Sequence, residues 1–353
     1  MKHTVTLATA FLTFAVGQSY AAERLETTVV ETANEASVSH RRTALSADEI
    51  ANTSINTIED VTRYIPGVQV NDSGNRFSDN GFNIRGLEGD AVAVTVDGVS
   101  LGETLAPPAF SAYGMYDSNR GQVEIEHVKL IEITKGPSSV SNGEAALAGS
   151  VAYTTYDPVD FLIESGDTFY QGVKAGFDSR SDEGMYNLTL ANRTGSLESL
   201  LMVTIRDSDE MKAHDDGFYT HGPGREQADP LDREALSILL KLSYEVADGQ
   251  RIGFAYDRTD RTADGIILSR NATLLSQQSY DNFRTDDNND KERFEVSYDW
   301  ADAENILFDS LSAAFNYQEL YTSGVSNFEF ASRGASYLRQ EDRSTEQDVT
   351  SVN

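Results

Sequence analysis

The stretch RFEVSYDW, residues 293–300, alternates without a break between polar and apolar side chains. Successive side chains of a β-strand point to opposite faces, so this stretch predicts a strand with one apolar and one polar face. The apolar face holds Phe294, Val296, Tyr298 and Trp300, and the polar face holds Arg293, Glu295, Ser297 and Asp299. The same alternation recurs over 236–246 and 311–318. From residue 161 onward the pattern predicts consecutive antiparallel strands, about seven or eight of them.

The connections between these strands also follow a pattern. Short turns are predicted at 193–198, 247–250 and 301–305, and long loops at 207–232, 260–291 and 322–345. Short turns on one rim and long loops on the other are typical of a transmembrane β-barrel of the bacterial outer membrane. A soluble β-sandwich is the alternative, because it also buries one face of each strand.

The size of such a barrel is limited by what precedes it. A barrel of about eight strands is filled by its own side chains, so it has no room for another domain. The last stretch, residues 339–353, is also too polar for a terminal strand that faces lipid. We therefore expect 161–353 to be the first part of a larger barrel.

Residues 45–160 predict a small α+β domain. Ser46 is a helix-capping residue, and Ile50, Ile55, Ile58 and Val61 then recur at roughly helical spacing until Pro66 and Gly67. Residues 92–96 alternate as a strand, and Asp97-Gly98 is a hairpin turn signal.

A run of small residues interrupts this domain within IEITKGPSSVSNGEAALAGSVAYTT, residues 131–155. This run follows the break at Gly136-Pro137. Fixing such small, flexible residues in one conformation on folding costs conformational entropy. Gly136, Gly143 and Gly149 let the backbone turn and lie close to a crowded wall. An ordinary glycine loop at a sheet corner is the alternative.

The N-terminus predicts export. Lys2 and His3 precede an apolar run over 4–17, and small residues follow at 19 and 21, so 1–21 is expected to be a signal peptide. A buried N-terminal helix is the alternative. Residues 22–44 are polar and are expected to be a flexible segment, except for the apolar island at 27–30. That island is either a strand that adds to a partner's sheet edge or a chance cluster.

Composition excludes several classes of function. The net charge of -29 argues against nucleic acid as a partner. The chain has no cysteine and five histidines, which excludes disulfides and thiolate metal sites and argues against a histidine-rich metal scavenger. No nucleophile–base motif stands out, so we do not expect an enzyme.

Together these segments resemble the TonB-dependent outer-membrane receptors. The segments IEDVTRYIPGVQV (58–70), FNIRGLEGDAVAVTVDGVS (82–100) and 131–155 resemble the signatures of the plug domain in this family. The resemblance implies a plug inside a barrel of about 22 strands, of which the chain holds roughly the first third. The plug residues that match are Arg85, Gly86, Asp97, Gly98, Gly136, Pro137, Gly143 and Gly149.

The resemblance also implies a location and a partner. It places the chain in the outer membrane, in contact with lipid, and makes the energy-transducing protein TonB its periplasmic partner. The segment that resembles a TonB box consists of Glu26, Thr27, Thr28, Val29, Val30, Glu31, Thr32 and Ala33.

Within the family, residues 83–99, 136–162 and 229–261 look most like the haem, haemoglobin, transferrin and lactoferrin receptors. This similarity implies haem as the transported ligand, taken directly or from haemoglobin or another host iron protein, and no intrinsic cofactor. A ferric-siderophore receptor is the second hypothesis, and a β-rich surface adhesion protein is the third.

The candidate ligand residues depart from this branch. Many of its members carry a histidine after the DGV strand, whereas residues 100–126 contain none and offer Tyr113 and Tyr116 instead. A tyrosinate can ligate ferric haem iron, and Arg120 beside the two tyrosines suits an anionic chelate. His214 and His221 lie on a predicted long loop and are further candidates, whereas His127 is expected to be structural.

Overall fold

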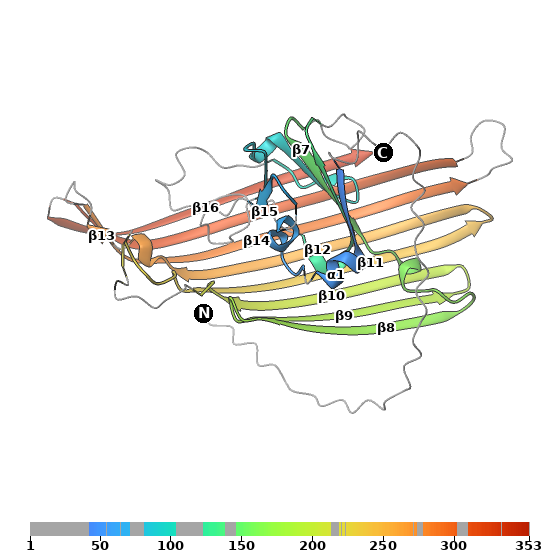
Figure 1. Cartoon of the computed structure of the whole chain (residues 1–353), viewed down its shortest axis with the longest axis horizontal. Helices are drawn as coiled ribbons and strands as arrows, with labels where there is room; N and C mark the ends of the chain where they lie inside the picture. The colour runs from blue at the N-terminus through green and yellow to red at the C-terminus, as the bar shows by residue number, and fades with distance from the viewer. Residues whose placement is uncertain are drawn as a thin grey trace, which may run out of the picture.

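In the computed structural model, the described residues form two bodies (Figure 1). We call those between 42 and 160 the plug, and the long strands from 168 onward the wall. The predicted signal peptide and TonB box lie outside the described residues, as do Tyr113, Tyr116, Arg120, Gly143 and His214. The structure describes residues 42–53, 55–63, 65–70, 81–103, 123–137, 146–212, 219, 221–222, 224–270, 272–273, 278–301, 310–332 and 334–352. Within these ranges, no helix has both the length and the apolar character needed to span a membrane.

The plug contains a five-stranded sheet with the order β1-β6-β7-β4-β5. Strands β4 and β7 are parallel, and the other neighbouring pairs are antiparallel. A separate pair, β2–β3, lies beside it. The strands are β1 (Arg42–Ser46), β2 (Val68–Val70), β3 (Phe82–Ile84), β4 (Val92–Val96), β5 (Val99–Ser100), β6 (Val128–Lys135) and β7 (Gly149–Thr155). The sheet therefore begins at Arg42, three residues before the expected start of the domain.

The expected helical stretch is two short helices, α1 (Ala47–Asn52) and α2 (Ile58–Thr62). The division occurs because Thr57 starts a second helix. The Thr57 side chain accepts a hydrogen bond from the Asp60 amide, and the Asp60 carboxylate accepts one from the Thr57 amide. Such a reciprocal capping box satisfies backbone donors that a continuous helix would bond internally. Single-turn 3-10 helices are η2 (Gly89–Ala91), η4 (Ile125–His127), η6 (Pro158–Asp160) and η7 (Leu268–Arg270).

One apolar core joins the plug helices to the plug sheet. It contains the predicted helical residues Ile50, Ile55, Ile58 and Val61, and it includes Val92, Val94 and Val96 of β4. At Gly149 the backbone lies close to β6 of the plug rather than to the wall, since an added Cβ would lie 2.1 Å from the carbonyl oxygen of Thr134. Gly149 therefore keeps β7 against β6.

The wall is a nine-stranded sheet of consecutive antiparallel strands. It agrees with the predicted seven or eight strands, since the ninth, β13 (Ala272–Thr273), is a short addition to β14. The long strands are β8 (Thr168–Asp178), β9 (Glu183–Thr194), β10 (Leu197–Asp209), β11 (Leu231–Ala247), β12 (Gln250–Ile266), β14 (Gln278–Ala301), β15 (Ser310–Ser332) and β16 (Ala335–Val352). The connection between β9 and β10 and that between β11 and β12 lie at one end, the turn end. The connections β8–β9 and β10–β11 lie at the other end, the far end.

Two of the predicted long loops are wrong. Most of 260–291 and of 322–345 is strand, and β15 and β16 are separated by residues 333–334 alone. The prediction failed because polar residues occupy both faces of these strands, as in Asp286-Asp287-Asn288-Asn289, so the alternation disappears. Strand β14 has 24 residues, whereas crossing a bilayer takes about ten.

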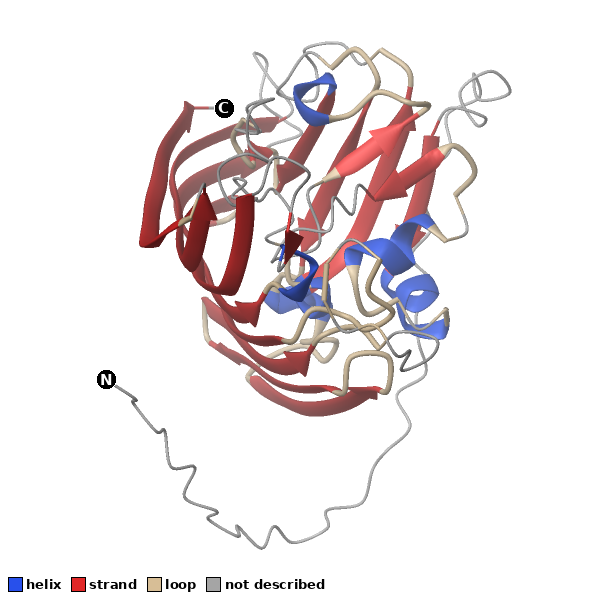
Figure 2. Ribbon diagram, turned by 90° about the vertical axis from the view of Figure 1, so that its left-hand side faces the viewer, coloured by secondary structure: helices blue, strands red, loops and turns tan. Residues whose placement is uncertain are grey.

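The wall curves around the plug (Figure 2). The side chains with which the wall bonds the plug, such as Arg206 and Arg293, belong to its polar face, so this face points inward. Val296 is 52% exposed on the outer face, whereas Arg293 and Ser237 on the inner face are each 1% exposed. A soluble sandwich buries its apolar faces, so this sheet has the opposite arrangement and the sandwich alternative is wrong. An apolar outer face with a polar interior is the arrangement of a barrel wall that faces lipid.

Candidate functional site between plug and wall

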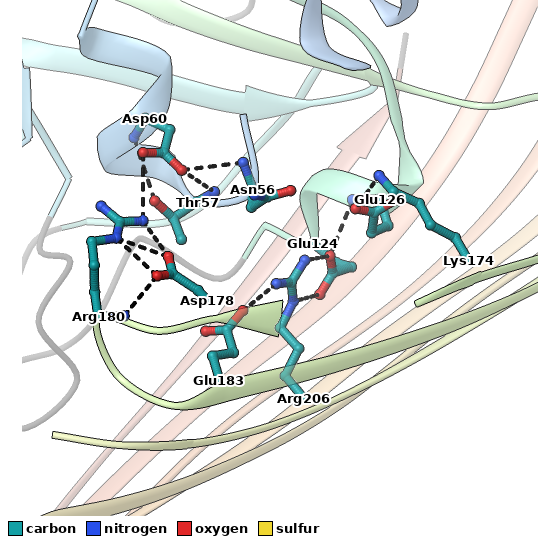
Figure 3. Close-up of polar contacts among 10 residues, drawn as sticks. All are labelled: Asn56, Thr57, Asp60, Glu124, Glu126, Lys174, Asp178, Arg180, Glu183 and Arg206. Atoms are coloured by element: carbon teal, nitrogen blue, oxygen red, sulfur yellow. Dashed lines mark hydrogen bonds and ion pairs between the residues drawn. The ribbon is translucent and has the colours of Figure 1, made fainter. Parts of the chain in front are cut away.

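Glu124 of the plug binds Arg206 of the wall. The Glu124 carboxylate, at the start of η4, accepts two hydrogen bonds from the β10 guanidinium, at 2.9 and 2.7 Å. Arg206 also donates to Glu183 of β9 at 2.6 Å, so one arginine joins three elements (Figure 3). Burial alone would raise the pKa of Glu124, but the charge and hydrogen bonds of Arg206 lower it to about 2.

This contact makes the docking of the plug pH-dependent. A carboxylate whose pKa is lowered by folding contributes its full stability above the unfolded value of 4.5 and loses it as the pH falls towards about 2. The shift corresponds to about 3 kcal/mol. We expect amide protection in the plug of the full-length receptor to fall across this range, as measured by hydrogen exchange. Arg206→Gln should flatten this part of the profile; an equal fall in both proteins would contradict the assignment.

Two further ion pairs lie beside this contact, each between a half-exposed cation and a largely buried carboxylate (Figure 3). Lys174 of β8 binds the Glu126 carboxylate at 2.8 and 2.9 Å. Arg180, in the β8–β9 turn, lies 3.7 Å from the capping carboxylate of Asp60. In these two pairs the lysine and arginine side chains are 52% and 44% exposed, so water weakens them more than the Glu124–Arg206 pair, in which both side chains are largely buried.

A second cluster is centred on Asp97, in the β4–β5 turn. Its carboxylate accepts hydrogen bonds from the amide and hydroxyl of Thr155, at 2.8 and 2.7 Å, and from Arg293 of β14 at 2.6 Å. Arg293 also donates to the carbonyl of Val96 at 2.8 Å. Burial would raise the pKa of Asp97, but the positive charges of Lys241 and Arg293 hold it well below its usual range. Asp97 therefore ties two plug strands and the wall together.

Further polar contacts surround this cluster. Lys241 of β11 binds Asp157 at 2.9 Å, and Lys129 of β6 binds the same carboxylate at 2.6 Å. Gln318 of β15 donates to the carbonyl of Ser100 at 2.7 Å. These contacts are hydrogen bonds and charge pairs rather than apolar packing, so water can replace them when the plug moves.

His127 lies buried between the two clusters. Its Nε2 is 3.1 Å from the Thr204 hydroxyl of β10, and Asn187 of β9 donates to the same hydroxyl at 2.8 Å. Burial lowers the pKa of His127, so the ring stays neutral at neutral pH. This packing agrees with the structural role expected for it.

A pocket of about 120 Å³ opens beside Glu124 at the far end of the wall. The start of α2 and residues 123–125 form its plug side. Strands β9 to β12 form its wall side, where they present Arg206, Arg233 and Arg261. His221 is exposed in the connection between β10 and β11, at this same end. Across the described ranges, no group of three or more His, Asp or Glu side chains is placed to hold a metal ion.

The sequence-predicted plug residues lie mostly in turns. Arg85 and Gly86 follow β3 with φ of 56° and 87°, and Asp97 and Gly98 form the β4–β5 turn with φ of 51° and 80°. Gly136 and Pro137 end β6, and Pro137 is exposed. Asp97 is the one of these with a hydrogen bond to the wall in the described residues. Its partner Arg293, together with Arg206, Lys241 and Gln318, was missed because the sequence shows that they lie on a polar face but not what they meet.

Comparison with known proteins identifies the plug. Residues 34–150 match the family model of the TonB-dependent Receptor Plug Domain. Hemoglobin-binding protein A of Haemophilus influenzae is 31% identical over 306 residues, which are 84% of this chain and 30% of that protein. Probable hemoglobin and hemoglobin-haptoglobin-binding protein 1 of the same species is 31% identical over 272 residues, 73% of this chain and 25% of that one. The chain thus spans less than a third of these curated relatives.

Solved structures share the fold. The FrpB iron transporter from Neisseria meningitidis aligns with a TM-score of 0.59 over 88% of this chain and 49% of its own, at 15% identity. The Serratia marcescens hemophore receptor HasR, in complex with its hemophore HasA and heme, aligns with a TM-score of 0.50 over 88% of this chain and 59% of its own, at 14% identity. Both likenesses support a plug followed by the start of a barrel wall.

Proposed function

Because the chain belongs to the TonB-dependent receptor family, we propose that it is part of an outer-membrane receptor that imports haem iron, directly or from haemoglobin. The observation that carries this proposal is the 31% identity to a hemoglobin-binding protein, which extends over 84% of the chain and so covers plug and wall together. Energy comes from TonB, which pairs with the strand-forming segment at 26–33. Transport of this kind needs no catalytic step.

The plug–wall contacts support transport. A plug bound by buried charges and hydrogen bonds is held firmly, since removing one partner of such a pair leaves the other unsatisfied. The same contacts expose little apolar surface when they are exchanged for water. The plug can therefore block the passage at rest and still be partly released from the wall when TonB pulls on it.

The proposed ligand residues Tyr113, Tyr116 and Arg120 belong to the segment 104–122. Both flanks of this segment are fixed to the inner wall, since Glu103 exchanges two hydrogen bonds with Gln347 of β16, at 2.9 and 3.1 Å, and Glu124 binds Arg206. His214 and His221 belong to the connection between β10 and β11, of which His221 lies at the far end. We assign the haem-contacting surface to these two segments.

The tyrosines give a spectroscopic test. If Tyr113 or Tyr116 ligates ferric haem, its replacement by phenylalanine removes a ligand oxygen and shifts the haem absorption spectrum of the full-length receptor. The matched control is Tyr244→Phe, on the outer face of β11, where the side chain is 52% exposed and lies outside both segments. Unchanged spectra for both tyrosine variants would remove them as ligands and leave the histidines.

The cargo is tested by binding. Cells that express the full-length receptor should bind haemin and haemoglobin, and unlabelled haemin should compete while ferric siderophores should not. Competition by a ferric siderophore, with no haemin binding, would support the siderophore hypothesis instead.

A further inference from the structure

The imidazole of His127 lies at the boundary between plug and wall. The residue ends η4 and is 3% exposed. Its carbonyl accepts a hydrogen bond from the Tyr156 amide at 3.0 Å, which holds η4 against the end of β7. Its ring meets the Thr204 hydroxyl of β10 at 3.1 Å. The ring is thus already enclosed between the plug and the wall, and water has little access to it.

A chain of hydrogen bonds on the wall determines what the ring does at this contact. The Thr189 hydroxyl of β9 donates to the side-chain oxygen of Asn187 at 3.0 Å. The Asn187 side-chain amide in turn donates to the Thr204 hydroxyl at 2.8 Å. Because the Thr204 oxygen already accepts, its own hydrogen is left to donate to Nε2 of His127. In this arrangement Nε2 carries no proton and the imidazole is neutral.

A proton on Nε2 would reverse this contact. Both ring nitrogens of an imidazolium are donors, so the Thr204 hydroxyl would face a donor with its own hydrogen. The hydroxyl would have to turn, and its hydrogen would lose the acceptor that it has now. A buried donor without an acceptor is costly, so the hydrogen-bond chain favours the neutral ring.

The charges around the ring do not compensate for a proton. Those that act on it are Glu124, Arg206 of β10, Asp257 of β12 and Lys291 of β14. Each carboxylate already has its own cation, since Arg206 binds Glu124 at 2.7 Å and Lys291 binds Asp257 at 2.9 Å. The attraction and repulsion that they exert on an imidazolium largely cancel. Burial is therefore the main cause that lowers the pKa of His127.

Release of η4 from the wall would change these surroundings. Water would then reach the ring, and its pKa would return towards the ordinary value of 6.5. Above pH 6.5 the ring is neutral both in the docked and in the released plug, so its docking does not depend on pH there. Below 6.5 the released ring takes up a proton while the docked ring does not. The released state therefore gains by up to about tenfold for each pH unit.

We propose that His127 is a pH-dependent switch, through which acidification below pH 6.5 loosens the plug from strands β9 to β12 of the wall. Its pH range lies above that of Glu124, whose contribution is lost below 4.5. The inference concerns how the plug is held, so it does not depend on the cargo.

Hydrogen exchange of the purified full-length receptor, without haem, tests the proposal. The amides of η4 and β6, residues 125–135, report on opening of this part of the plug. Exchange times are adjusted for the intrinsic dependence of amide exchange on pH. The population of the open state should then rise by up to about tenfold between about pH 7.5 and 5.5, and stay constant between about pH 9 and 8.

A variant separates His127 from other titrating groups. In His127→Gln, the side chain can still accept a hydrogen bond from Thr204 but takes up no proton in this range, so the rise should disappear. The matched control is His40→Gln, which removes another imidazole, outside the described residues, and should leave the rise intact. An equal rise in His127→Gln and wild type, or a constant population in wild type, would overturn the proposal.

A second measurement needs no variant. Exchange of the C2 hydrogen of each imidazole, followed by mass spectrometry in the wild-type receptor, gives the pH at which that histidine is half protonated. This midpoint should lie below 6.5 for His127. A midpoint at or above 6.5 would overturn the proposal, even if His127→Gln fails to assemble.

Discussion

Replacing Val29 by proline should abolish haem uptake by the full-length receptor while leaving haemin and haemoglobin binding at the cell surface unchanged. Proline has no amide hydrogen and fixes its own backbone angle, so it removes one of the bonds that an added strand needs. Binding and energising are separate, because the proposed ligand residues lie in other segments. The measurement compares uptake of labelled haemin with its binding at equilibrium on the same cells.

The control for this experiment is Ala36→Pro, which places the same residue outside the proposed TonB box. It should leave uptake unaltered. Equal uptake by Val29→Pro and wild type, at equal receptor amounts, would refute the assignment of 26–33. Loss of surface binding by Val29→Pro would point to misassembly rather than to loss of energising.

Removing Arg293 should have the largest effect on the plug. In Arg293→Ala, the carboxylate of Asp97 and the carbonyl of Val96 both lose a buried donor. Breaking a buried ion pair costs about 3–5 kcal/mol. We expect the plug to unfold at lower urea concentration in the purified receptor, and cells to become sensitive to vancomycin, which an intact plug excludes.

The matched control is Arg258→Ala, on the outer face of β12. Its side chain is 46% exposed and pairs with Asp260, so its removal should cost less than about 1 kcal/mol. A double-mutant cycle of Arg293→Ala with Asp97→Asn isolates the pair itself. A coupling energy near zero would show that Asp97 does not anchor the plug.

The alternation of side chains was enough to predict the wall. Within 236–246 and 294–300, the sequence assigned alternate apolar side chains, beginning with Leu236 and Phe294, to one face of the sheet. In the structure that face is the outer one. The lengths of the strands could not be predicted, because 286–292 are polar on both sides and give no alternation. The division of the helical stretch also escaped prediction, since the capping residues Thr57 and Asp60 are interspersed among apolar residues that keep roughly helical spacing.

The site was harder to predict than the fold. Asp97 was identified as a turn residue, yet its bond to Arg293 joins positions separated by 196 residues. A polar residue on an inner face has many possible partners, and spacing along the chain does not select one. The same holds for Glu124 and Arg206, 82 residues apart. The candidate ligand residues were chosen from the segments in which they lie, and the segment with both tyrosines is outside the described residues.

The most direct test is growth of a Gram-negative host that cannot make haem, starved of iron and given the full-length gene. Haemin or haemoglobin is supplied as the source of both iron and porphyrin. Growth that needs the receptor and an intact TonB is the result we expect. No growth, with the receptor confirmed in the outer membrane, would contradict haem import.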